Sequence, residues 1–234
     1  MATIVLVHGS WHGGWCWKKL LPYLREQHHE IYAPTLTGLG ERNHLATNDT
    51  NLSTHVMDIT NLLFYEDLTE VYLIGHSYGG AVISGVAEKV PNKIKRLVYL
   101  DACIPQNNQS IFDIMPGLEA VFKKRTQISQ GKDWLVEPFD PKNWGIIKED
   151  DLQWIKSRLS PMPIHTHDEP IDIPNFEKSH ISKSYIRCSE FVDTKSFARV
   201  AKGDKNWDYH EIKSGHDVMV IHPEQLAKII SSLL

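Results

Sequence analysis

The chain has 234 residues, of which 41% are hydrophobic and 23% charged, and its formal net charge is -4. This length and composition are those of a globular protein with one large domain, or one domain carrying an insertion. The small negative charge and the lack of Lys- or Arg-rich runs argue against nucleic acid or an anionic membrane as a partner. No apolar run approaches the ~20 residues that a membrane helix needs.

The three cysteines, Cys16, Cys103 and Cys188, are an odd number without Cys-x-x-Cys spacing. They therefore predict neither a disulfide framework nor a zinc site. The apolar start of the chain lacks a basic leader and is more typical of a first strand than of a signal peptide. We expect reduced thiols in a cytoplasmic protein. The sequence leaves the oligomeric state open, a homodimer included.

Strand-like and helix-like patterns alternate through the first part of the chain. Short apolar runs predict strands at residues 3–7, 30–33, 71–74 and 96–100. Between them, apolar residues at helical spacing predict a helix over 15–24, a second helix capped by Ser53, and a third that follows Gly80 and stops before Pro91. This order predicts an α/β fold with a doubly wound, mostly parallel sheet covered on both faces.

The alternation breaks between residues 106 and 182. This segment has no strong strand pattern and holds seven of the twelve prolines, together with scattered short helical pieces rich in Trp and Phe. We interpret it as a helical cap inserted in the same domain, with residues 1–105 and 183–234 forming the core. Within it, His165-x-His167 is interpreted as a surface loop rather than a metal site. Strand patterns resume at 184–188 and 209–212, and a last helix follows Pro223.

The segment Gly75-His76-Ser77-Tyr78-Gly79 follows a predicted buried strand and begins a predicted helix. This Gly-x-Ser-x-Gly pattern is typical of a nucleophile elbow, in which a sharp turn raises the serine hydroxyl above the sheet. Ser77 is therefore the candidate nucleophile. A serine hydroxyl is a weak nucleophile at neutral pH and needs a base, which an acid in turn orients.

The order Ser, acid, His predicts that the base and the acid follow the last two strands. His216 lies on a turn just after the strand at 209–212, and it is the candidate base. Asp193 is the first choice for the acid because it lies far enough past its strand to bend back toward the histidine. Glu190 in the same loop and Asp101 at the end of the preceding strand are alternatives.

The negative charge that develops on a carbonyl oxygen during acyl transfer needs preorganised donors. The backbone N–H of Tyr78, directly after the nucleophile, is one candidate donor. The other is the N–H of Ser10, in the glycine-rich loop that follows the first predicted strand. Together they predict an oxyanion hole.

Three segments resemble the α/β-hydrolase superfamily: residues 5–15 with their His-Gly-x-x-His-Gly-x-Trp pattern, residues 75–80, and Gly215-His216. More narrowly, they resemble the branch of plant methyl esterases, hydroxynitrile lyases and small bacterial esterases. The resemblance implies that Ser77 is the nucleophile, His216 the base, and the N–H groups of Ser10 and Tyr78 the oxyanion hole. Relatives tend to carry the acid at the position that is Phe191 here.

The lyase members of this branch need a threonine and a lysine, and the corresponding positions here are Gly9 and Asp217, which disfavours that activity. The sequence predicts instead a serine carboxylesterase that hydrolyses a small, largely apolar ester through a Ser-His-Asp triad and an acyl-enzyme. No metal or organic cofactor is expected. Two alternatives stay open: a ligand-binding, receptor-like protein with little turnover, and another acyl hydrolase such as a thioesterase or lactonase.

Overall fold

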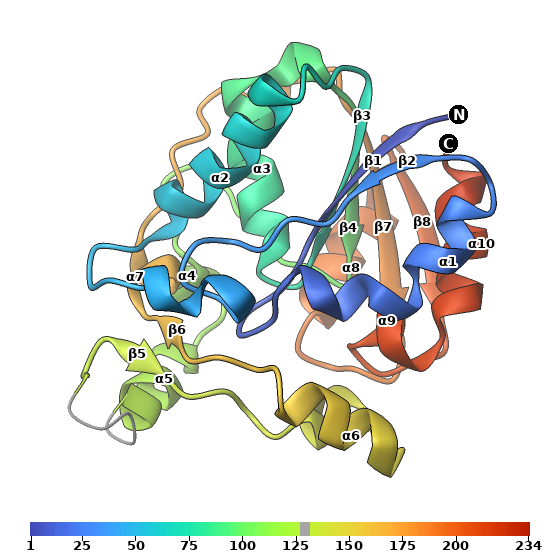
Figure 1. Ribbon diagram of the computed structural model, residues 1–234. Helices are drawn as coiled ribbons and strands as arrows, with labels where there is room; N and C mark the ends of the chain where they lie inside the picture. Colours follow the sequence, from blue (N-terminus) through green and yellow to red (C-terminus); the bar gives the residue numbers. More distant parts are fainter. Residues whose placement is uncertain (127–131) are drawn as a thin grey trace.

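The computed structural model describes residues 1–126 and 132–234 and contains a six-stranded sheet with helices on both faces (Figure 1). The strand order is β2-β1-β3-β4-β7-β8, and every neighbouring pair is parallel. The strands are β1 (Thr3–Val7), β2 (Glu30–Tyr32), β3 (Val71–His76), β4 (Ile94–Leu100), β7 (Ser182–Cys188) and β8 (Trp207–Ile212). The predicted α/β fold with a doubly wound, mostly parallel sheet is confirmed.

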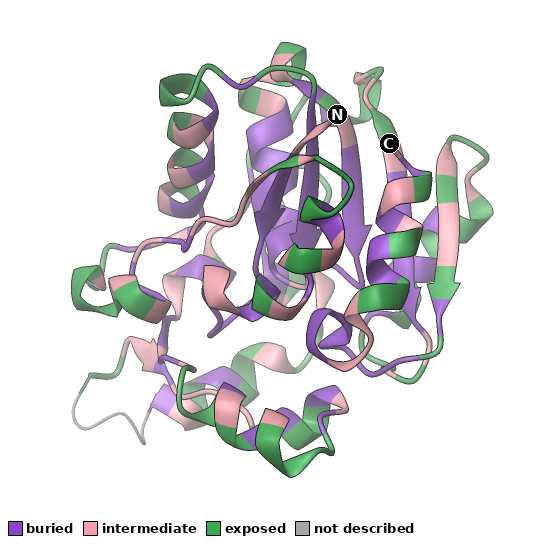
Figure 2. Ribbon diagram, turned by 45° about the vertical axis from the view of Figure 1, so that its right-hand side comes forward, coloured by how far each residue is buried: buried purple, intermediate pink, exposed green. Residues whose placement is uncertain are grey.

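Alternate residues of the central strands face two separate hydrophobic layers, as the period of two in a strand requires. Val5 and Leu73 belong to one layer, whereas Ile4 and Ile74 belong to the other. Figure 2 shows the strands of the sheet mostly buried and the outer faces of the helices exposed. Burial on both faces explains why the strand sequences are continuous apolar runs without polar alternation.

The helices divide between the two faces of the sheet. One face is covered by α2 (Leu52–Tyr65), α3 (Gly79–Lys89) and α8 (Lys195–Gly203); the other is covered by the 3-10 helix η1 (Gly14–Lys19), α1 (Leu21–Arg25), α9 (Val218–Ile221) and α10 (Pro223–Ser232). Among the described residues, no helix has the length and apolar character needed to cross a bilayer.

Two helix boundaries differ from those predicted. The helix expected over 15–24 is divided into η1 and α1, because Pro22 has no N–H for helical hydrogen bonding and occupies the first turn of α1. The cap of α2 is Asn51 rather than Ser53: the Asn51 side chain accepts a hydrogen bond from the N–H of Thr54, and the Thr54 hydroxyl faces the N–H of Asn51. This reciprocal pair satisfies two backbone donors that Ser53 would leave unpaired.

The segment between β4 and β7 lies beyond the carboxyl ends of the strands (Figure 1). It contains α4 (Ile111–Ile114), α5 (Leu118–Thr126), α6 (Glu149–Lys156), α7 (His165–Asp168) and an antiparallel pair of two short strands, β5 (Leu135–Val136) and β6 (Met162–Pro163). We keep the name cap for residues 106–182. Its position means that any side chain at the carboxyl edge of the sheet has the cap above it.

Hydrogen bonds tie the cap to the loop that follows β1. The indole Nε1 of Trp11 donates to the carbonyl oxygen of Val136 at 2.9 Å, and the N–H of Ser160 donates to the carbonyl oxygen of Trp11 at 3.1 Å. The Ser160 hydroxyl accepts from the N–H of Gly40 at 2.9 Å. The cap is thus fixed to the same loop that carries the candidate oxyanion donor Ser10.

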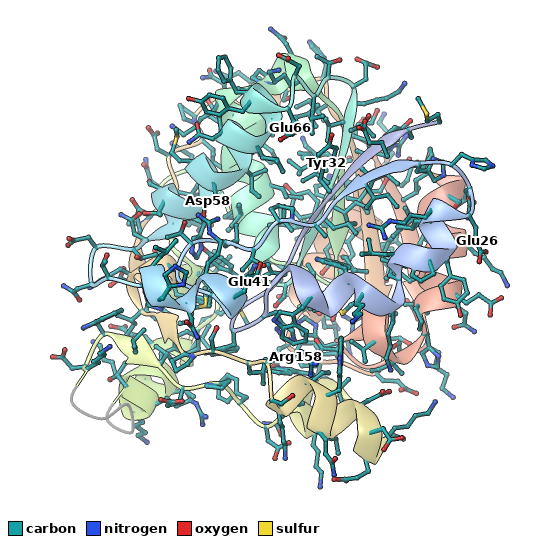
Figure 3. The ribbon with its side chains drawn as sticks, viewed as in Figure 1. Glu26, Tyr32, Glu41, Asp58, Glu66 and Arg158 are labelled. Atoms are coloured by element: carbon teal, nitrogen blue, oxygen red, sulfur yellow. The ribbon has the colours of Figure 1, made fainter. Side chains whose placement is uncertain are left out.

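The loop after β2 is fastened to α2 by Asp58, which lies on that helix (Figure 3). Its carboxylate accepts hydrogen bonds from the N–H and the hydroxyl of Thr37, at 2.6 and 2.8 Å. Arg42 lies 3.6 Å from the same carboxylate and also donates to the Thr37 hydroxyl. These contacts hold the carbonyl oxygen of Thr37, which is the partner of His55 beneath the site described below.

The turn between β3 and α3 has no room for side chains on its glycines. A Cβ at Gly75 would lie 2.5 Å from the carbonyl oxygen of Gly79, and one at Gly80 would lie 2.2 Å from the carbonyl oxygen of Cys103. Backbone atoms cannot move away as the end of a flexible side chain can. The close approach of these segments, and not helix propensity, therefore requires the glycines.

Gly80→Ala should destabilise the protein by about 3 kcal/mol or more, because the added methyl group meets backbone atoms of the neighbouring strand end. Gly203→Ala is the matched control, since Gly203 ends α8 and a methyl group there would meet no atom within 4 Å. We expect the control to stay within about 1 kcal/mol of the native protein. Urea unfolding monitored by circular dichroism measures both, and equal stabilities for the two variants would contradict this packing argument.

Candidate active site

Ser77 lies at the apex of the turn between β3 and α3 with φ of 56°, in the left-handed region that non-glycine residues seldom occupy. Two backbone hydrogen bonds hold it there: its N–H donates to the carbonyl oxygen of Leu100 at 3.2 Å, and its own carbonyl oxygen accepts from the N–H of Cys103 at 3.1 Å. The serine is therefore fixed to the end of β4 on both sides. Such strained, well-supported residues are frequent at functional sites.

His216 is buried beside this turn and hydrogen-bonds to a carboxylate. Its Nδ1 lies 2.7 Å from Oδ2 of Asp101, and both side chains are almost completely shielded from solvent. A carboxylate at Nδ1 keeps the proton on that nitrogen, so Nε2 carries the free lone pair. The imidazole of His76 packs 4.5 Å from that of His216, and its Nε2 donates to the His216 carbonyl oxygen at 3.1 Å.

Asp101 takes the position expected for Asp193. The Oδ1 atom of Asp101 accepts hydrogen bonds from the Thr194 hydroxyl at 2.7 Å and from the N–H of Cys188 at 3.2 Å, and Arg187 lies 3.9 Å away. The buried carboxylate thus has donors on both oxygens and a nearby cation. Such partners are what a buried charge requires.

The structure therefore does not bring Asp193, the expected acid, to the imidazole. Asp193 and the alternative Glu190 are both exposed, and neither makes a hydrogen bond to His216 in the part of the chain that the structure describes. Phe191, between them, stacks on the imidazole with a centroid distance of 4.1 Å and an interplanar angle of 25°. An aromatic ring thus covers the histidine from this loop, and the carboxylate that hydrogen-bonds to it comes from the end of β4.

Two histidines fix the loop that follows β1. Nδ1 of His8 donates to the carbonyl oxygen of Gly9 at 2.8 Å, and Nδ1 of His12 donates to that of Ser10 at 2.7 Å. The Gly9 carbonyl and the Ser10 N–H belong to one trans peptide and point in opposite directions. The hydrogen bond that fixes the Gly9 carbonyl therefore also fixes the direction of the Ser10 N–H. Among the described residues, the N–H groups of Ser10 and Tyr78 have no hydrogen-bond partner. Both donors are free to receive a negatively charged oxygen.

His12 also forms a buried pair with Asp217, at 3.3 Å from Nε2 to Oδ2. Both ring nitrogens of His12 therefore face acceptors, which favours the doubly protonated imidazolium. Burial alone would lower the pKa of His12, but the charge of Asp217 and the hydrogen bonds to Asp217 and Ser10 outweigh it and raise that pKa. A cation consequently supports the loop that carries the Ser10 N–H.

Ser77, His216, Ser10 and Tyr78 line one cavity of about 300 Å³ under the cap. Its other walls are mainly apolar and aromatic: Trp11, Met115, Leu118, Phe122, Phe139 and Phe191. A second cavity of about 20 Å³ lies between the loop after β1, the turn at Ser77 and His216. The structure therefore brings the serine, the imidazole and the two free N–H donors together at an apolar chamber. It leaves Asp193 on the chamber wall.

His167 in the cap is a cavity residue that the sequence interpretation missed. The interpretation of His165-x-His167 as a surface loop is wrong for His167, which is buried in helix α7, whereas the His165 side chain is 42% exposed. The two histidines lie two residues apart on the same one-turn helix, and no local pattern in the sequence indicates which of them is buried. Among the described residues, no cluster of three or more His, Cys, Asp or Glu side chains could hold a metal ion.

Buried neutral histidines should make the protein unstable in weak acid. Burial lowers the pKa of His8 and His167 from 6.5 to about 3, and lowers those of His55 and His76. The unfolded chain then binds protons that the folded chain does not, so stability is present above pH 6.5 and is lost as pH falls. The raised pKa of His12 has the opposite effect on stability, because protonation of His12 stabilises the folded chain. This stabilisation is fully present below pH 6.5 and does not grow as the pH falls further.

We expect the free energy of unfolding to fall by about 2 kcal/mol for each of His8 and His167 between pH 7.5 and pH 5. Urea titrations at the two pH values measure it. His44→Gln, at an exposed histidine, is the control and should show the same pH dependence as the native chain. Stability that is unchanged or higher at pH 5 would contradict the assignment of neutral, buried imidazoles.

Comparison with known proteins gives relatives over the whole chain. A carbendazim hydrolyzing esterase of Nocardioides sp. (strain SG-4G) is 32% identical over 242 aligned positions that cover 100% of both chains. Methylesterase 10 of Arabidopsis thaliana is 25% identical and covers 98% of this chain and 90% of its own. Among solved structures, an extracellular alpha/beta-hydrolase from a Paenibacillus species aligns with a TM-score of 0.86 and 25% identity, over 99% of this chain and 98% of its own.

Residues 4–229, nearly the entire chain, match the alpha/beta hydrolase family. The relatives found are esterases and methylesterases, and the sheet order and the turn at Ser77 agree with that assignment. The chain therefore belongs to the alpha/beta hydrolase family, as an ester-hydrolysing enzyme of the branch that contains the methylesterases.

Proposed function

We propose that this protein is a serine carboxylesterase that uses Ser77, His216 and Asp101 and forms an acyl-enzyme on Ser77. The observation that carries the proposal is the 2.7 Å hydrogen bond between Asp101 and Nδ1 of His216, on the wall of the cavity that Ser77 also lines. A base oriented by a buried acid beside a serine on a sharp turn is what nucleophilic catalysis by a hydroxyl needs.

In the first half-reaction, the Ser77 oxygen attacks the ester carbonyl carbon while Nε2 of His216 takes the hydroxyl proton. The N–H groups of Ser10 and Tyr78 receive the negative charge that moves onto the carbonyl oxygen. The protonated imidazole then gives its proton to the alcohol oxygen as the carbon–oxygen bond breaks. The alcohol leaves, and the acyl group remains on Ser77.

In the second half-reaction, a water molecule attacks the acyl carbon and His216 takes its proton. The imidazolium returns that proton to the Ser77 oxygen as the acid is released. Throughout, Asp101 stabilises the imidazolium without accepting its proton. Thr194 and the N–H of Cys188 donate hydrogen bonds to the carboxylate and so fix its orientation toward the imidazole.

The cavity supports a small ester with a largely apolar acyl group, because its walls are mainly aromatic and aliphatic side chains. The relatives named as methylesterases support a small alcohol group. Hydroxynitrile lyase activity is disfavoured, since Asp217 is an anion paired with His12 where a cation would be needed. At Gly9, a Cβ would lie 2.9 Å from Cβ of Ser77, which leaves no room for a threonine.

Ser77→Ala should lower kcat for p-nitrophenyl butyrate by at least about 10⁴-fold, because it removes the atom that carries the acyl group. The native protein should release a burst of p-nitrophenol and acquire a fluorophosphonate adduct at Ser77, detected by mass spectrometry. Ser232→Ala, at an exposed serine near the C-terminus, is the control. Unchanged turnover in Ser77→Ala would reject the mechanism, whereas tight ester binding with almost no turnover in the native protein would favour the receptor-like alternative.

The choice of acid is tested by two matched carboxylate-to-amide changes. Asp101→Asn should lower kcat by about 10⁴-fold, since an amide leaves the imidazole in the wrong tautomer. Asp193→Asn should change kcat by less than about tenfold, because that carboxylate makes no contact with His216. Thermal unfolding confirms that each variant is folded. A loss in Asp193→Asn as large as that in Asp101→Asn would restore Asp193 as the acid.

A further inference from the structure

A chain of hydrogen bonds connects the cap to the loop that follows β1. The Thr166 hydroxyl donates to the carbonyl oxygen of Pro163 at 2.6 Å, so its proton is committed. Nδ1 of His167 lies 2.8 Å from the same hydroxyl oxygen and must therefore be the donor of that bond. The donor of each hydrogen bond in this chain is therefore fixed by the bond before it.

The remaining nitrogen of His167 is consequently an acceptor. Burial lowers the pKa of His167 to about 3, so the ring is neutral and Nε2 carries a lone pair. Ser10 Oγ lies 3.1 Å from this nitrogen. The Ser10 hydroxyl proton is therefore donated to His167, and the lone pairs of Ser10 Oγ are left without a donor in the part of the chain that the structure describes.

Packing fixes the histidine in this orientation. Its ring stacks on that of Tyr78 with a centroid distance of 4.8 Å and an interplanar angle of 16°, and it contacts Phe122 at 4.7 Å. The side chain is only 2% exposed. A ring held on two sides cannot turn over to present Nδ1 to Ser10. The polarity of the hydrogen-bond chain is thus built into the fold.

Of the other polar side chains that line the cavity, Asn143 and Asp193 are exposed, and the buried ones already have partners. The Trp11 indole N–H is donated to Val136, and the Tyr78 hydroxyl is paired with His55 at 2.9 Å. The Thr194 hydroxyl is donated to Asp101. Ser10 Oγ is therefore the acceptor that a polar group of a bound molecule would find in this part of an otherwise apolar chamber.

We propose that Ser10 Oγ, held by His167, accepts a hydrogen bond from the acyl part of the substrate, so that the enzyme prefers esters with a hydroxyl or N–H group on the carbon next to the ester carbonyl. This inference rests on the proposed esterase function. Ser10 would contact the substrate twice, through its N–H to the carbonyl oxygen and through Oγ to the neighbouring donor. An α-hydroxy ester presents that acceptor and that donor side by side.

Three esters that differ at one substituent test the preference, each used as the enantiomer with the same spatial arrangement. Methyl mandelate carries the donor, methyl O-methylmandelate keeps the oxygen but lacks the donor, and methyl 2-phenylpropanoate replaces the hydroxyl by a methyl group of similar size. The kcat/KM for methyl mandelate should exceed that for either comparator by about 10-fold to 100-fold, because each comparator leaves the buried acceptor unpaired. A ratio below about threefold overturns the proposal.

Variants separate the acceptor from its support. Ser10→Ala keeps the backbone N–H but removes Oγ. Its ratio of kcat/KM for methyl mandelate to kcat/KM for either comparator should fall to within about threefold of one. His167→Phe keeps an aromatic ring against Tyr78 but cannot accept the Ser10 proton, and its ratio should fall at least threefold below the native value. His165→Ala, at the half-buried histidine of the same helix that pairs with Asp168, should keep the native ratio. Because each ratio is taken within one variant, a general loss of activity cancels.

A native ratio in Ser10→Ala would overturn the recognition role of Oγ, and a native ratio in folded His167→Phe would overturn the role of the histidine. Binding of the same three esters to Ser77→Ala, measured by calorimetry, separates this inference from the proposed function. A dissociation constant about tenfold lower for methyl mandelate would support the acceptor even if the native protein hydrolysed none of the esters. Equal dissociation constants in that case would reject it.

Discussion

The structure depends on one buried carboxylate. Asp101 ends β4 and receives hydrogen bonds from the backbone at the end of β7, from the start of α8 and from the imidazole that follows β8. Three segments far apart in the sequence therefore converge on a single charge, and each supplies a donor that offsets the cost of burying it. Since the turn that carries Ser77 is also hydrogen-bonded to the end of β4, the proposed nucleophile and the proposed base are positioned from the same strand.

Histidines provide most of the remaining polar support, and their protonation states differ by environment. His8 and His167 are neutral because burial opposes charge, whereas the anion of Asp217 favours the charged form of His12. The neutral rings serve as fixed donors and acceptors with defined direction. The charged ring holds the Ser10 carbonyl oxygen. One residue type thus performs several structural tasks around the chamber because local partners, and not sequence position, decide which nitrogen carries a proton.

The sheet and the turn at Ser77 could be predicted from the sequence because both follow from local patterns: buried strands are continuous apolar runs, and the close approach at Gly80 admits no side chain. The acid could not. All parallel strands end at the same edge, so spacing along the chain does not distinguish a carboxylate after β4 from one after β7. His167 was missed for a similar reason: the burial of one residue in a short cap helix depends on long-range packing that no local pattern records.

The location of the proposed acid, Asp101, at a strand end has a consequence for how this enzyme could diversify. In the loop after β7, Asp193 lines the chamber, and Nδ1 of His216 hydrogen-bonds to Asp101 instead. Asp193 can therefore accept substitutions that reshape the acyl pocket, whereas Thr194 in the same loop has to keep the hydroxyl that donates to Asp101. A protein engineer seeking new ester specificities would find here a position at which randomised libraries need not sacrifice the chemistry to explore shape.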